Sequence, residues 1–111
     1  RSHSLQLVVP MDVRGVTGYQ DFVDEAPLDL VYVANDRRSK LIPASRRVAF
    51  ASASAGAIAQ NVFLFCASEG LSTVIRAWIA RKALAEALTL GQHEHILFSQ
   101  TVGYPLKGRE T

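Results

Sequence analysis

The residues of this chain whose types could carry out catalysis form none of the common sets, such as Ser-His-Asp or paired carboxylates. The run His93-Glu94-His95 puts two imidazoles two positions apart, so on a β-strand both would face the same side. No Cys or other His lies nearby to complete a metal site, and a water-exposed turn leading into a strand is the favoured interpretation. The residues by themselves therefore identify neither a catalytic group nor a metal site.

Arg76 is unusual because apolar neighbours surround it in the sequence Val74-Ile75-Arg76-Ala77-Trp78. Its guanidinium would extend to solvent, pair with a carboxylate, or face an anionic or planar ligand. Spacing alone leaves these alternatives open.

The single cysteine and the basic residues point to ordinary structural roles. Cys66 has no partner for an internal disulfide, and its neighbours Phe65 and Ala67 predict a buried, inert thiol. Basic residues gather before the apolar centre of the chain, and such a cluster can be a nucleic-acid footprint. The net charge is only +2, so we favour a solvated loop and expect no nucleic-acid partner; the cluster comprises Arg37, Arg38, Lys40, Arg46 and Arg47.

The element that must position any site is a long apolar helix. Residues Val48 to Ser68 contain no charged side chain, and the sequence predicts a helix over about residues 45–69. Apolar residues occupy every side of it, which is typical of a helix that is buried all round. In 111 residues little other surface is left to enclose it, so a partner subunit or a further part of the same protein is expected. A membrane span has this length, but adjacent Gln60 and Asn61 are costly in lipid, so no membrane partner is expected.

The rest of the chain predicts strands and helices without a regular βαβ alternation. Strands are expected at 5–9, 28–34 and 95–102, and helices at 12–23 and 81–90, the latter ended by Gly91. Residues 71–78 are expected to form an extended or irregular connection. With 49% hydrophobic and 20% charged residues, the chain is expected to be a single α+β domain.

Three sequence blocks, in this order, resemble the nitroreductase family. The first is Ala26-Pro27-Leu28-Asp29-Leu30-Val31-Tyr32-Val33-Ala34, similar to the family's central strand. The second is Ala55 to Arg76, similar to the central helix and the segment after it, and the third is Gln100-Thr101-Val102-Gly103-Tyr104-Pro105. The short nitroreductases related to azoline-oxidising dehydrogenases of peptide maturation are the most similar type.

The resemblance also implies that residues 1–111 are a single partial domain, the C-terminal part of a nitroreductase-like fold. Members of the family begin with a helical half that carries an Arg-Arg-Ser-type flavin motif and a Pro-Ser…Asn segment. Neither is found here, because Arg37-Arg38-Ser39 follows the central strand instead of preceding it. The resemblance is therefore compatible with a fragment that has no activity by itself. No N-terminal targeting region is visible, and a cytoplasmic location is favoured.

The family resemblance implies FMN bound at the interface of an intertwined homodimer. The loop after the central helix, Ile75, Arg76, Ala77 and Trp78 here, would present backbone amides to the N5 and O4 edge of the ring. Relatives usually have glycine in place of Ala77 and a helix-capping aspartate in place of Ala80. Lys107 and Arg109 stand where many relatives neutralise the flavin phosphate, although a solvated terminus is the favoured interpretation of this tail.

The function implied is that of an FMN-dependent NAD(P)H oxidoreductase. Its hydride transfer would be ping-pong, with a nitroaromatic, a quinone or a similar small molecule as the electron acceptor. The flavin would do the redox chemistry, so no catalytic side chain and no metal is expected. The alternative is a non-catalytic dimerisation or ligand-binding module without its own flavin site.

Overall fold

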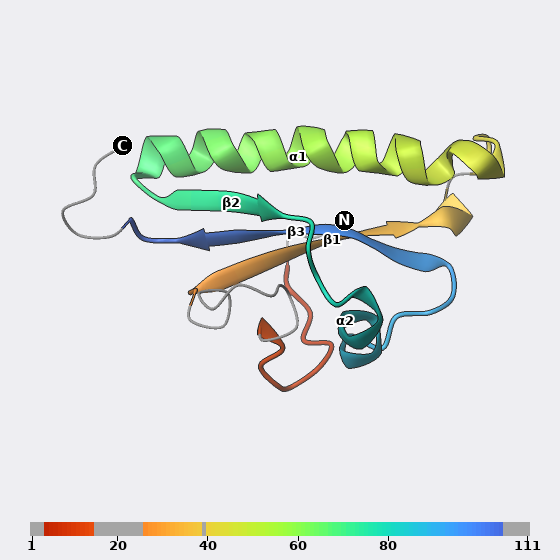
Figure 1. Cartoon of the computed structure of the whole chain (residues 1–111), viewed down its shortest axis with the longest axis horizontal. Coiled ribbons are helices and arrows are strands. Elements are labelled where there is room, and N and C mark those ends of the chain that lie inside the picture. The colour runs from red at the N-terminus through yellow and green to blue at the C-terminus, as the bar shows by residue number, and fades with distance from the viewer. Residues whose placement is uncertain (1–3, 15–25, 39, 106–111) are drawn as a thin grey trace.

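The computed structural model describes residues 4–14, 26–38 and 40–105, and it has an antiparallel sheet with a long helix along one face (Figure 1). The strand order is β1-β3-β2, so β3 is central. The α+β class expected from the sequence is confirmed. The elements in chain order are β1 (Leu28–Asn35), the 3-10 helices η3 (Asp36–Arg38) and η4 (Ala44–Arg46), α1 (Arg47–Glu69), β2 (Ser72–Arg76), α2 (Arg81–Ala87) and β3 (Glu94–Gly103).

Two of the expected strands form, and a third appears where an extended or irregular connection was expected. The strands predicted at 28–34 and 95–102 are β1 and β3, each within about a residue of its expected ends. Of the two alternatives expected at 71–78, an extended or an irregular connection, the extended one is confirmed for Ser72–Arg76, which pairs with β3 in the register Ser72↔Gly103 to Arg76↔Ser99. β-branched Thr73, Val74 and Ile75 suit a strand, and pairing with β3 supplies the partner that local sequence does not show.

The long helix has the bounds that the sequence predicted. α1 runs from Arg47 to Glu69, and Gly70 ends it in the left-handed conformation with φ 70°. The amides of Gly70 and Leu71 both donate to the Cys66 carbonyl, which closes the last turn. Glycine reaches this φ without the steric penalty of a side chain. The predicted burial of Cys66 is confirmed, at 1% exposure.

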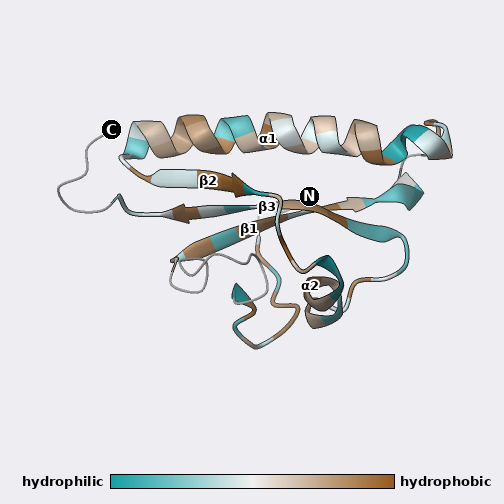
Figure 2. Ribbon diagram, in the orientation of Figure 1, coloured by the Kyte–Doolittle hydropathy of each residue, from teal (hydrophilic) through white to brown (hydrophobic). Residues whose placement is uncertain are grey.

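Only one side of α1 is covered by the part of the chain that the structure describes. Ala55, Ala59 and Cys66 are its buried residues, and they share the side that packs on the sheet. By length and composition the helical segment Ala44–Glu69 could cross a membrane, and 11% of its most apolar stretch is buried inside the chain. The composition of α1 predicts burial on all sides, and the described residues bury only one side. The absence of a membrane partner stays a prediction. Figure 2 shows the helix mostly white and brown between hydrophilic ends.

The shorter helix lies across the sheet from α1 and ends earlier than expected (Figure 1). It was predicted to run to Leu90 and to stop at Gly91. Instead, Thr89 takes the left-handed conformation at φ 55°, its amide donates to the Glu86 carbonyl and the Leu90 amide donates to the Ala85 carbonyl. These two bonds form a Schellman-type end, which closes the helix before glycine is reached.

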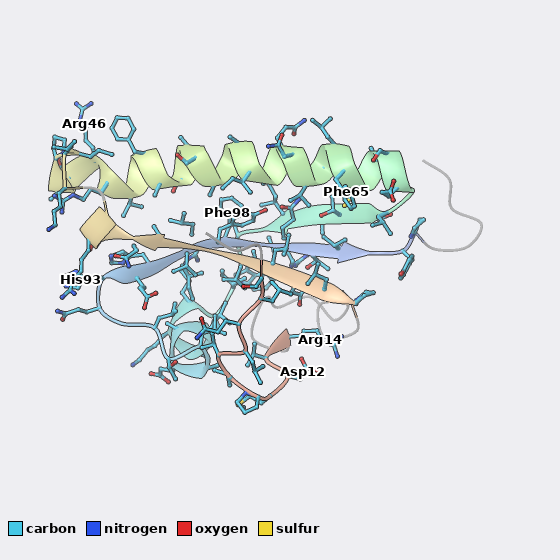
Figure 3. All side chains as sticks on the ribbon, turned by 180° about the vertical axis from the view of Figure 1, so that it is seen from behind. Asp12, Arg14, Arg46, Phe65, His93 and Phe98 are labelled. Atoms are coloured by element: carbon cyan, nitrogen blue, oxygen red, sulfur yellow. The ribbon has the colours of Figure 1, made fainter. Side chains whose placement is uncertain are left out.

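The strand expected at 5–9 was wrong. These residues form no strand, and Leu5 and Leu7 are highly exposed, because no neighbouring strand pairs with them in the described structure. Most of the helix expected at 12–23 falls outside the described residues. At its start, Asp12 accepts hydrogen bonds from the Arg14 amide and guanidinium (Figure 3), and the Arg14 side chain lowers the pKa of Asp12 to about 2.

Candidate functional site

The residues expected to contact a flavin lie at the junction of β2 and α2. Ile75 and Arg76 are the last residues of β2, and Ala77 and Trp78 form the start of the following loop. Arg76 is 4% exposed and Ile79 is 6% exposed, whereas Trp78 between them is 68% exposed. Two buried side chains thus hold a short segment whose exposed residues, Ala77 and Trp78, face outward from the fold.

Two hydrogen bonds hold the end of this loop that leads into α2. The Arg81 amide donates to the Ile79 carbonyl at 3.0 Å, and Arg81 Nη2 donates to the Leu97 carbonyl of β3 at 2.9 Å. Leu97 lies at the irregularity in the β1–β3 pairing, where Tyr32 pairs with Phe98 and Val33 with Ile96. Leu84 of α2 is fully buried and anchors the helix that follows the loop. The loop therefore has a defined position relative to the central strand.

The loop follows an edge strand of the described sheet and has no positive φ at Ala77. Within the described sheet β2 is an edge strand, and edge strands leave alternate amides unpaired by the sheet. Ala77 does not adopt a positive φ. Among the described non-glycine residues, Thr89 is the one that does. Alanine at position 77, where relatives usually have glycine, therefore carries no strain from a left-handed conformation. The expected lack of a helix cap is confirmed, since Ala80 is the N-cap of α2 and makes no side-chain capping bond.

Arg76 is directed into the fold and not toward solvent. Its strand partner is Ser99, which is fully buried, so the guanidinium lies on the same side of the sheet as that hydroxyl. Of the alternatives that the sequence left open, extension to solvent is excluded by this burial. The prediction that the backbone of Arg76 contributes to a flavin site is untested by the geometry.

A buried polar contact connects the central strand to α1. Gln100 of β3 is fully buried, its Oε1 accepts from Tyr32 Oη at 2.6 Å, and its Nε2 donates to the Ala59 carbonyl at 3.4 Å. The Tyr32 ring also lies 4.7 Å from that of Phe98, and desolvation raises the pKa of Tyr32. Ile75 is the β2 partner of Gln100, so this contact lies one strand away from the predicted flavin segment.

A second polar cluster joins the end of β1 to the start of β3. Asp36 Oδ1 accepts from His93 Nδ1 at 2.9 Å and Asp36 Oδ2 accepts from His95 Nε2 at 3.0 Å. These hydrogen bonds, that of His95 foremost, hold the pKa of Asp36 below its ordinary value against the opposing effect of desolvation. Figure 3 shows His93 at the end of the sheet nearest the beginning of α1.

The contact of both imidazoles with Asp36 was missed in the sequence analysis, which expected them to face water. Antiparallel pairing of Asn35 with Glu94 brings the three side chains together, and that pairing is not visible in the local sequence. Within the described residues, no group of three or more His, Cys, Asp and Glu side chains is arranged to hold a metal ion. The cluster connects the end of β1 to the start of β3 by hydrogen bonds.

Lys107 and Arg109, the predicted phosphate ligands, lie outside the described residues. Their role stays a prediction.

Comparison with known proteins gives the class of this fold. Residues 3–104 match the nitroreductase family. A protein from Ralstonia eutropha JMP134 assigned to the nitroreductases has 49% identity and a TM-score of 0.78, over 86% of this chain and 46% of its own. Nitroreductase A from Vibrio parahaemolyticus has 26% identity and a TM-score of 0.64, over 81% of this chain and 42% of its own.

The NADPH:FMN oxidoreductase from Vibrio harveyi, in complex with NAD+, shares the fold with 24% identity and a TM-score of 0.65. It is matched over 81% of this chain and 43% of its own length. No match is found among curated proteins.

This chain belongs to the nitroreductase family, as its sequence blocks predicted. It spans a little under half the length of the solved structures that it matches, which is consistent with the predicted partial fold.

Proposed function

We propose that the complete protein containing this chain is an FMN-dependent NAD(P)H oxidoreductase that acts as a homodimer. Membership of the nitroreductase family over residues 3–104 is the observation that carries the proposal. The V. harveyi neighbour, described as an NADPH:FMN oxidoreductase, supports it at the level of the fold. Hydride transfer is expected to be ping-pong, with a nitroaromatic or quinone as the acceptor.

The exposure pattern of the residues at the β2–α2 junction supports a flavin site there. Ala77 and Trp78 are exposed while their neighbours Arg76 and Ile79 are buried, so backbone donors at the loop are held in place before any ligand binds. Preorganised amides directed at developing negative charge stabilise it strongly, because no reorganisation is needed during the reaction. Bound FMN would supply the hydride exchange, and this loop would hold the electron-accepting edge of its ring.

The first test is whether the complete protein binds FMN and oxidises NAD(P)H. We expect a yellow protein whose initial rates, at several fixed acceptor concentrations, give parallel double-reciprocal lines. A protein that stays colourless with added FMN and oxidises no NAD(P)H would contradict the enzyme and support the non-catalytic module.

The second test removes one backbone donor from the loop. Ala77→Pro deletes the amide hydrogen, and Ala77→Ser is the matched control that keeps it. If this amide donates to FMN, the proline variant should bind FMN about tenfold to a hundredfold more weakly, as expected for a lost hydrogen bond to a charged group. Equal FMN affinity in the two variants, with both folded by circular dichroism, would remove position 77 from the site.

A further inference from the structure

β2 pairs with only the later part of β3. Its last pair is Arg76 with Ser99, whereas β3 begins at Glu94. If the pairing kept its register for two more residues, Trp78 would lie opposite Leu97. Instead, Trp78 is 68% exposed and the chain turns away from the sheet into α2 (Figure 1). The β3 backbone at Leu97 is therefore left for a partner other than β2.

Arg81, the first residue of α2, supplies that partner. Its Nη2 donates to the Leu97 carbonyl at 2.9 Å. Leu97 has no strand partner on the β1 side either, because the register there passes from Phe98 directly to Ile96. An amide of a longer β2 and the Arg81 guanidinium would compete for the same carbonyl. The contact of Arg81 with Leu97 thus opposes any extension of the β2–β3 ladder beyond the end of β2.

The same residue also fixes the backbone at the far end of the loop. The Arg81 amide donates to the Ile79 carbonyl at 3.0 Å. Ile79 is 6% exposed and Leu84 is fully buried, so the start of α2 is packed into the fold. Residues 77 and 78 lie between this anchored point and the last pair of the ladder. A connection this short, held at both ends, has few conformations open to it.

We propose that Arg81 is a positioning residue for the predicted flavin segment, residues 75–78. Its bond to Leu97 ends the β2–β3 ladder and holds Ala77 and Trp78 away from β3. The role toward FMN rests on the proposed function, whereas the position of the loop is a property of the chain itself. A loop that is ordered before its ligand arrives loses less conformational entropy on binding, and this raises affinity.

Backbone order in the complete protein without FMN, measured by ¹⁵N NMR relaxation, tests the position of the loop directly. The amides of Ala77 and Trp78 should have order parameters near about 0.85 in the wild type and about 0.6 or less in Arg81→Met. Arg81→Lys keeps a cationic donor and should restore most of the order. Lys82→Met is the matched control, because Lys82 is an exposed cation at the next position of α2. Equal order and unchanged chemical shifts at both amides in Arg81→Met would overturn the inference.

FMN titration of the same variants tests what the loop position contributes. Arg81→Met should bind FMN about threefold to tenfold more weakly than the wild type, and Arg81→Lys should stay within about twofold of it. In an Ala77→Pro background the effect of Arg81→Met should largely disappear, because both substitutions act through the same loop. Independent, multiplicative effects would overturn the positioning role, as would an equal loss in Lys82→Met. A wild type that binds no FMN, but whose loop order is lost in Arg81→Met, would contradict only the proposed function.

Discussion

The buried contact between Tyr32 and Gln100 should respond to substitution as a coupled pair. Tyr32→Phe keeps the ring beside Phe98 but removes the hydroxyl that donates to Gln100 Oε1 at 2.6 Å. Because Gln100 is fully buried, its oxygen would lose this donor without gaining direct access to water. We expect the free energy of unfolding to fall by about 1–3 kcal/mol, the cost of an unsatisfied buried acceptor.

Urea unfolding of the complete protein at one fixed protein concentration measures this loss. Gln100→Met removes the amide with little change of size, so Tyr32→Phe should cost less in that background than in the wild type. The interaction free energy from the double-mutant cycle should lie in the range of about 0.5–3 kcal/mol found for contacting residues. Tyr104→Phe is the control, since Tyr104 is 77% exposed and its variant should stay within about 0.5 kcal/mol of the wild type. Additive effects of the Tyr32 and Gln100 substitutions would refute the coupling.

Four further predictions follow, three from the local geometry and one, for Lys107 and Arg109, from the family resemblance. Ala80→Asp should raise the unfolding free energy by about 0.5–2 kcal/mol, because aspartate can cap the beginning of α2. Thr89→Gly should raise it by about 1 kcal/mol, because it removes a β-branched residue from the left-handed conformation. Urea midpoints measure both changes, and no gain in either variant would contradict the geometry of that helix end. The lowered pKa of Asp36 means that its stabilisation is complete above the ordinary value of 3.8 and is lost as the pH falls through the lower folded-state pKa. Asp36→Asn should therefore lower the urea midpoint near pH 7 and lower it progressively less below about pH 4, whereas a difference that does not depend on pH would exclude the ionised carboxylate as its cause. Lys107→Ala with Arg109→Ala should weaken FMN binding by about 2–4 kcal/mol if they bind the phosphate, and titration of FMN fluorescence should show no change if they are ordinary surface residues.

The sequence by itself determined the elements whose signals are local. The charge-free run before Glu69-Gly70 defined α1 and its end, because a glycine adopts the left-handed conformation there at little cost. The β-branched and aromatic residues of 28–34 likewise defined β1. The ordered blocks around these elements were sufficient to predict the family, which the match over residues 3–104 confirms.

Only the tertiary structure decided features that depend on which segments meet. Ser72–Arg76 became a strand because β3 lies beside it, and that pairing turned Arg76 inward next to Ser99. Asp36 met both imidazoles because β1 ends opposite the start of β3, a contact between residues more than fifty positions apart. The apolar composition of α1 was visible in the sequence. Which side of the helix is buried was decided by its packing on the sheet. Long-range pairing fixes such choices, since hydrogen bonds and apolar contacts between distant segments outweigh the small energy differences among local conformations.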